Sequence, residues 1–342
     1  MSTIQFPFET PPKGAEAIEV ADGVLWLRLP LPMKLDHVNI YALDEGDSWT
    51  IVDTGFHTKR MIEEWTAILE GPLKGKPVNR VLVTHHHPDH VGMAGWFQAE
   101  HRAELVTTRT SWLFARMLTL DEQDNWPDET IAFYKSAGMK PDILAQRQAE
   151  RPFNYADIVY PMPLGFTGLA EGDVFRAAGR DWDVRLGNGH APDHITLWSR
   201  DDDLVLAGDQ IIPGISPNIG VYATQPDADP LSGWMESCTR FAALAEDRHF
   251  VLPGHKSPFT GLPARMRQLI ENHDHALERL LAHLETPSTA AECFPPIFKR
   301  EITGMEYGLA LVESIAHLNH LLHKGLAVRS RREDGAWVWE RP

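Results

Sequence analysis

Four potential metal ligands lie within six residues of one another in the first third of the chain. They are His85, His87, Asp89 and His90, in the segment 84–92 (THHHPDHVG). An apolar, β-rich run precedes them and a helical pattern follows, so we expect a strand-to-helix turn. His85 and His87, two residues apart in extended chain, project the same way. Imidazole and carboxylate groups at this density predict a metal site.

Other histidines need a different explanation. His86 alternates away from His85 and His87, so it is left out of the ligand set. Six of the 17 histidines fall in C-terminal helical segments without an acidic partner at ligand spacing. We expect these six to be surface or core residues: His273, His275, His283, His317, His320 and His323.

Further motifs follow in order along the chain. Residues 51–55 (IVDTG) lie upstream, and 189–194 (GHAPDH), 206–209 (LAGD) and 253–255 (PGH) lie downstream. Together with His-x-His-x-Asp-His, they resemble the metallo-β-lactamase superfamily of metal-dependent hydrolases over residues 18–285. The ordered context argues against a chance match.

The resemblance implies ligands for two metal ions. His85, His87 and His190 would hold the first ion, Asp89, His90 and His255 would hold the second, and Asp209 would bridge them. Nitrogen and oxygen ligands suit zinc, so we expect two divalent ions, with zinc preferred. Zinc lowers the pKa of bound water to about 7, which makes hydroxide the expected nucleophile.

Three residues are candidates for catalysis. Asp89 would hold the hydroxide in line for attack, and His194 matches a family histidine that sits beside the site. Tyr222, in the loop after Asp209, is either a donor to the oxyanion or a packing residue. Asp53 is either a partner that orients a metal-bound histidine or a turn residue before Gly55.

The resemblance implies an α/β fold, an αββα sandwich, and short strands alternating with helical patterns agree with it. We expect a catalytic domain over 1–285, with a helical insertion at about 107–167, and a small winged-helix-like domain over 286–342. The insertion is rich in large apolar side chains, Trp112 and Phe133 among them. It would form a lid for an apolar substrate, a satellite core or a subunit contact.

The expected function is hydrolysis of a small carboxyl derivative, namely a thioester, an ester or a lactone. Without a thiolate ligand, the site resembles the glyoxalase II pattern. Alternatives are a single-strand endoribonuclease-like enzyme, a β-lactamase, and a metal-binding interaction module without activity. The net charge is −16, and residues 286–342 carry seven Lys and Arg against seven Asp and Glu. Since nucleic-acid enzymes need a basic face, we expect a small acyl substrate and no nucleic acid.

Composition also indicates the cellular compartment of the protein. Two cysteines, Cys238 and Cys293, give no disulfide framework, which favours a reducing compartment. The first residues lack the pattern of a signal peptide, and no uncharged stretch is long enough to span a bilayer. We therefore expect a soluble, cytoplasmic protein without a membrane partner, in which the C-terminal domain packs on the catalytic domain or forms a homodimer.

Overall fold

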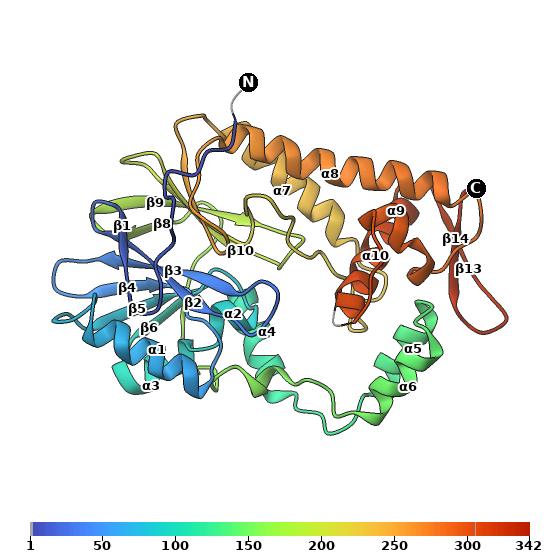
Figure 1. The fold of residues 1–342 in the computed structure, drawn as a ribbon, viewed down its shortest axis with the longest axis horizontal. Helices are drawn as coiled ribbons and strands as arrows, with labels where there is room; N and C mark the ends of the chain where they lie inside the picture. The colour runs from blue at the N-terminus through green and yellow to red at the C-terminus, as the bar shows by residue number, and fades with distance from the viewer. Residues whose placement is uncertain (1–2, 305) are drawn as a thin grey trace. The chain divides into compact units, whose positions relative to one another are not determined.

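The computed structural model describes residues 3–304 and 306–342 (Figure 1). These residues form two compact units. The first consists of Met1–Glu122, Asn154–Pro217 and Leu244–Arg265, and the second of Gln123–Phe153, Asn218–Ala243 and Met266–Pro342. The whole segment 286–342 lies in the second unit, together with two segments from earlier in the chain. The boundary at 285/286 stays a prediction.

The first unit contains a mixed sheet of seven strands in sequential order. Its antiparallel half is β1 (Ile18–Ala21), β2 (Val24–Pro30), β3 (His37–Asp44) and β4 (Trp49–Val52). Its parallel half adds β5 (Val78–Leu82), β6 (Glu104–Thr107) and β7 (Thr167–Gly168) to β4. Parallel neighbours need crossover connections, and helices supply them here.

Two of these helices, α1 (Lys59–Glu70) and α3 (Ala94–His101), cover one face of the first sheet (Figure 1). Thr58 begins α1 by accepting a hydrogen bond from the Met61 backbone N–H (3.1 Å), as an N-cap does. Trp65 of α1 and Phe97 of α3 meet edge to face, with ring centroids 4.7 Å apart. The apolar faces of both helices are thereby buried against the strands.

A second sheet of five strands packs on the other face of the first. In spatial order its strands are β12 (Phe250–Pro253), β11 (Leu204–Gly208), β10 (His194–Ser199), β9 (Arg180–Gly187) and β8 (Val174–Ala177). The shared core includes Trp26 and Leu82 from the first sheet and Trp182 and Leu206 from the second. The predicted α/β class and sandwich are therefore confirmed.

The predicted insertion, 107–167, is divided between the units. Helix α4 (Arg109–Leu120) and the short 3-10 helix η1 (Tyr155–Asp157) belong to the first unit. Helices α5 (Asp128–Ser136) and α6 (Pro141–Ala149) belong to the second. The aromatic side chains of the insertion are therefore divided between the two units.

The second unit also holds most of α7 (Pro230–Leu244) and α8 (Leu262–His283), and all of α9 (Phe294–Phe298) and α10 (Glu306–His323). The 3-10 helix η2 (Ala291–Cys293) leads into α9. A hairpin of β13 (Val328–Arg331) and β14 (Trp337–Glu340) follows α10. The winged-helix assignment stays a prediction. Within the part of the chain that the structure describes, no helix has the length and apolarity needed to cross a bilayer.

Candidate metal centre

The candidate metal centre is built from loops at strand ends of both sheets, all within the first unit. The turn after β5 carries His85 and His87 and leads into α2 (Pro88–Val91), a single turn that carries Asp89 and His90. The loop between β9 and β10 carries His190. Asp209 follows β11 and His255 follows β12, and these two strands are paired in parallel. Parallel pairing brings their carboxyl ends to the same edge.

The structure brings together all seven residues that the sequence predicts as ligands. They form three overlapping groups, in each of which the candidate ligand atoms lie within 4.8 Å of one another. The groups are His85, His87 and His190; His85, His90 and Asp209; and Asp89, His90 and His255. His and Asp clusters that could hold a divalent metal ion are therefore present.

Asp209 lies between the two predicted triads. Its Oδ2 is 3.5 Å from His190 Nε2 and 3.2 Å from His255 Nε2. Its Oδ1 is 3.4 Å from His90 Nε2. The Asp209 carboxylate therefore approaches imidazoles of both predicted triads.

Hydrogen bonds on the outer ring nitrogens fix the direction of the inner ones. His90 Nδ1 donates to Asp53 Oδ2 (2.8 Å), and His255 Nδ1 donates to the carbonyl oxygen of His37 (2.7 Å). His85 Nδ1 lies 3.0 Å from Thr84 Oγ1, which in turn lies 2.9 Å from Asp53 Oδ2. Such contacts leave Nε2 of each ring as the ligand atom.

One buried atom tests whether these residues fit a metal ion. His85 Nε2 is buried and has no hydrogen-bond partner among the residues that the structure describes. A buried polar atom without a partner costs about 1–3 kcal/mol. A cation bound by the first triad would satisfy this nitrogen, so the donor set and its orientation fit a divalent metal.

The two triads differ in their electrostatics. Burial, reinforced by neighbouring histidines, holds the pKa values of His85 and His87 well below the usual range, so both rings are neutral ligands. Burial also opposes charge on His255, but the carboxylates of Asp209 and Asp89 outweigh it and raise its pKa to about 10. The pKa of His90 lies well above its usual value for the same reason. Asp89 and Asp209 thus place negative charge at the second triad, and protons on the rings of His90 and His255 balance this charge.

Asp53 fills both of the roles that the sequence left open. Its backbone φ of 63° is the left-handed conformation of a turn residue. Its side chain is buried and accepts hydrogen bonds from His90 Nδ1 and from the Thr84 backbone N–H (2.8 Å). The left-handed turn at Asp53 therefore directs the Asp53 carboxylate toward His90.

His194 contacts the centre without joining any of the three groups. Its ring stacks on that of His85, with centroids 4.5 Å apart, and its Nε2 accepts a hydrogen bond from the Asp209 backbone N–H (3.0 Å). Burial lowers the pKa of His194 to about 3. These contacts favour positioning of Asp209 over proton transfer.

His86 and Tyr222 are not members of the three ligand groups. The His86 ring stacks on Phe114 with centroids 5.0 Å apart. Tyr222 is half exposed and belongs to the second unit. The catalytic role of Tyr222 stays a prediction.

Several supporting residues carry no signal in the sequence. The Tyr155 hydroxyl donates to the carbonyl oxygen of His86 and so holds the ligand turn. Asn39 Nδ2 donates to the carbonyl oxygens of Pro253 (2.9 Å) and Lys256 (2.7 Å), on either side of His255. These contacts use backbone acceptors, which any residue type offers. Only the fold could identify them.

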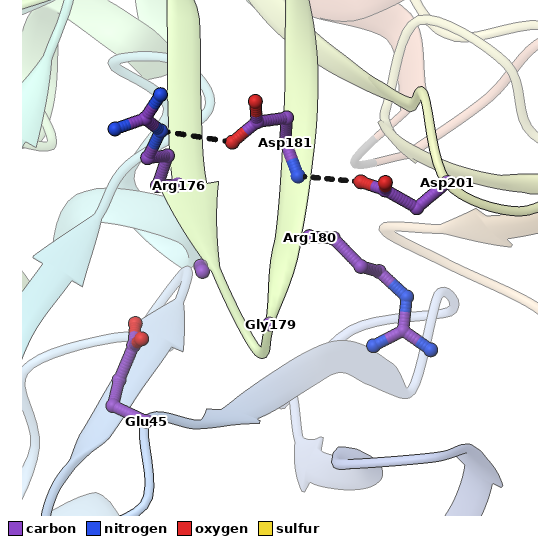
Figure 2. Close-up of a pocket in the computed structure, with 7 residues that line it drawn as sticks. Glu45, Arg176, Gly179, Arg180, Asp181 and Asp201 are labelled. Carbon is purple, nitrogen blue, oxygen red and sulfur yellow. Dashed lines mark hydrogen bonds and ion pairs between the residues drawn. The ribbon is translucent and has the colours of Figure 1, made fainter.

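A separate pocket lies at the tip of the β8–β9 hairpin (Figure 2). Its charged groups pair with each other: Arg176 Nε donates to Asp181 Oδ1 (2.9 Å), and the Asp181 backbone N–H donates to Asp201 Oδ2 (2.8 Å). The pocket adjoins the start of β9, whereas His190 follows the end of that strand. It is therefore distinct from the metal centre.

The fold and the ligand set define a class of protein, and comparison with known proteins identifies the same class. Residues 33–255 match the Metallo-beta-lactamase superfamily, and residues 277–342 match the Metallo-beta-lactamase-like, C-terminal domain. The chain therefore belongs to the metallo-beta-lactamase superfamily. This membership confirms the predicted superfamily and supports metal-dependent hydrolysis as the class of reaction.

Relatives match almost the whole chain. A beta-lactamase domain protein from Burkholderia ambifaria is 35% identical, with a TM-score of 0.90, over 99% of this chain and 98% of its own. A metallo-beta-lactamase family protein from Thermus thermophilus is 26% identical, with a TM-score of 0.78, over 94% of this chain and 100% of its own. The probable metallo-hydrolase YqjP of Bacillus subtilis is 26% identical over 88% of this chain and 92% of its own.

Proposed function

We propose that the protein is a dinuclear metal-dependent hydrolase of a small carboxyl derivative, either a thioester, an ester or a lactone. The observation that carries this proposal is the position of Asp209, within 3.5 Å of imidazole nitrogens from both triads. A single structural ion would not need two triads that share a carboxylate.

Each triad would hold one ion. His85, His87 and His190 supply three neutral nitrogens, and Asp89, His90 and His255 supply two nitrogens and a carboxylate. We propose zinc for both positions, because the donors are imidazole and carboxylate. When bound, such ions lower the pKa of a water molecule and polarise a carbonyl oxygen.

The chain itself supplies orientation and access. The side chains of His90 and His255 are almost fully buried, whereas that of Asp89 is 17% exposed. Substrate would therefore approach on the side of Asp89. The Asp89 carboxylate, 3.3 Å from His255 Nε2, would hold the attacking hydroxide in line. His194 would keep Asp209 in place through the Asp209 backbone N–H.

The substrate class follows from charge as well as from the ligands. A net charge of −16 opposes long-range steering of a polyanion such as RNA. A small acyl substrate meets no such barrier, and its carbonyl carbon is the atom that an activated water attacks. We therefore favour a carboxyl derivative over the endoribonuclease-like alternative.

Elemental analysis and a substrate screen test the proposal. Protein purified without chelator should contain close to two divalent ions per chain, and Asp209→Asn should lose metal and activity together. Asp44→Asn is a matched control, because Asp44 pairs with Lys76 (2.6 Å) at the opposite end of β3 from the centre.

The zinc-loaded protein should hydrolyse thioesters, esters or lactones faster than β-lactams or RNA. Absence of bound metal would refute the proposal, and so would a preference for RNA. Cleavage that slows steeply with added salt would indicate phosphate contacts and would favour the nuclease alternative.

A further inference from the structure

Helix α4 presents an apolar face to solvent. Four of its side chains, Leu113, Phe114, Met117 and Leu120, are between 36% and 71% exposed. The buried side of the helix carries Ser111, Ala115 and Thr119, and two larger side chains, Trp112 and Leu118, pack against the core of the first unit. A surface helix usually carries polar residues on the face opposite its core contacts, whereas this face of α4 is apolar. Folding alone does not account for such a surface.

The apolar face of α4, defined as Leu113, Phe114, Met117 and Leu120, adjoins the metal centre. The Phe114 ring stacks on the His86 ring, and the centroids of His86 and the predicted ligand His87 are 4.9 Å apart. The face is therefore continuous with the ligand turn. From Phe114 to Leu120 it extends about 9 Å along the helix, at 1.5 Å per residue.

The first turn of α4 also contacts the second ligand loop. The Thr110 hydroxyl donates to Asp193 Oδ2, and Asp193 lies between His190 and His194 in the chain. The start of α4 is thus held beside both loops that supply the first triad. A molecule lying along the helix would have one end at the metal centre.

The charge of Arg116 is directed away from this face. Arg116 Nη1 donates to the carbonyl oxygen of Met162 (3.0 Å), and its guanidinium lies over the Trp112 ring. An uncharged face favours an uncharged occupant, because burying an unpaired charge is costly.

Other aromatic side chains of the insertion are already packed. Trp112 Nε1 donates to the carbonyl oxygen of Pro163 (3.0 Å), and the Trp112 ring stacks on Phe166. Phe133 is buried in the second unit, edge to face with Trp337. Only α4 therefore remains a candidate lid, because Trp112 packs against the core of the first unit and Phe133 is buried in the second.

We propose that the apolar face of α4 binds the acyl chain of the substrate while the carbonyl group lies at the metal centre. This inference rests on the proposed function and adds a substrate class to it: medium-chain aliphatic acyl derivatives. Contact with His86, next to His87, is the reason to assign the face to substrate. A second copy of the chain would also cover an apolar surface, and the experiments below separate the two.

The first experiment measures kcat/KM for acyl thioesters of one thiol, from acetyl to decanoyl. Burial of a methylene stabilises by about 0.8 kcal/mol, so kcat/KM should rise up to about fourfold for each added methylene. Phe114→Ala and Met117→Ser should flatten this dependence. Phe6→Ala is the matched control, because Phe6 is 53% exposed in the first unit but lies outside α4, and it should keep the wild-type profile.

The second experiment measures binding of decanoate by calorimetry, without turnover. Wild-type protein should bind decanoate, and Phe114→Ala should bind it more weakly. If thioesters are hydrolysed with a flat chain-length profile and decanoate binds both proteins equally, the acyl assignment is overturned and the proposed function stands. If no acyl compound is hydrolysed but decanoate binding still depends on Phe114, the proposed function fails and the apolar site stands.

Size-exclusion chromatography of Met117→Ser provides the third measurement. The elution volume should not change, because a substrate-binding face is free between turnovers. Conversion of a wild-type dimer into a monomer by this substitution would identify the face as a subunit interface and would overturn the assignment.

Discussion

Asp53→Asn offers the sharpest test of how the metal centre is organised. Asparagine suits the substitution because it tolerates the left-handed backbone at this position (φ 63°), so the turn should be preserved. The negative charge is lost, and an amide NH2 facing His90 Nδ1 would oppose the proton that this nitrogen donates to Asp53 in the parent protein. His90 would then carry its proton on Nε2 and lose the lone pair that binds the metal.

Loss of such a supporting carboxylate typically weakens metal affinity 10- to 100-fold, which is about 1.4–2.7 kcal/mol. Competition against a chromophoric zinc chelator gives the stepwise affinities of the two ions. One of these two affinities should be 10- to 100-fold weaker in Asp53→Asn than in the parent protein. In a His255→Ala background, where only the first triad is complete, Asp53→Asn should weaken the remaining affinity less than tenfold, because Asp53 reaches His85 only through Thr84.

Asp44→Asn controls for the general loss of a carboxylate and should leave both affinities unchanged. Equal weakening of zinc binding in the parent and the His255→Ala backgrounds would refute the assignment of Asp53 to His90. Unchanged affinity in both would refute the view that outer hydrogen bonds orient the ligands.

Two further predictions follow from buried contacts. In Gly254→Ala, the added methyl would overlap Asp209 Oδ1, so we expect elemental analysis to show lost metal; Gly165→Ala, with no atom within 4 Å, is the control. Glu313→Gln should stabilise the protein, because burial raises the pKa of Glu313 from 4.5 to about 7. Between these values the folded state binds more protons than the unfolded state, so stability falls as pH rises. In denaturant unfolding, the free energy of unfolding of Glu313→Gln should exceed that of the parent protein by up to about 3 kcal/mol at pH 8 and by little at pH 4.5. The control Glu301→Gln, at an exposed position, should show no gain.

Each of these outcomes can fail in an informative way. Full metal content in Gly254→Ala would show that the Asp209 carboxylate can move without cost to metal binding. A stability gain in Glu313→Gln that is the same at pH 4.5 and pH 8 would show that the folded protein does not keep this carboxyl protonated, whatever the effect of the amide on packing.

The ligand set could be predicted from the sequence because its members lie in short motifs at strand ends. A strand end is visible as an apolar run that stops, and His85 or Asp209 directly follows such a run. In a sandwich with parallel strand pairs, these ends meet at one edge. The resemblance of these motifs to the superfamily implied the same seven residues that the structure brings together.

The supporting contacts to backbone carbonyls could not be predicted, because they join distant parts of the chain and any residue type offers such an acceptor. The carbonyl of His37 accepts from His255, 218 residues further on. The same limit applies to the insertion, where the sequence grouped Trp112 with Phe133. In the structure these two rings pack in different units. The sequence could not show this, because the type of a side chain does not determine which surface of a helix is buried.

The contacts behind the ligands also explain how one carboxylate can serve both triads. Asp209 is fixed at its backbone by His194, and the three imidazoles that approach its oxygens belong to His90, His190 and His255. Two of those rings are held from behind, His90 by Asp53 and His255 by the His37 carbonyl. The directions of their ligand atoms are therefore set by hydrogen bonds of the chain itself, anchored on β3 and on the turn after β4. Because the fold already supplies this orientation, a bound metal ion would not need to order these side chains, and the cost of ordering them would not reduce its affinity.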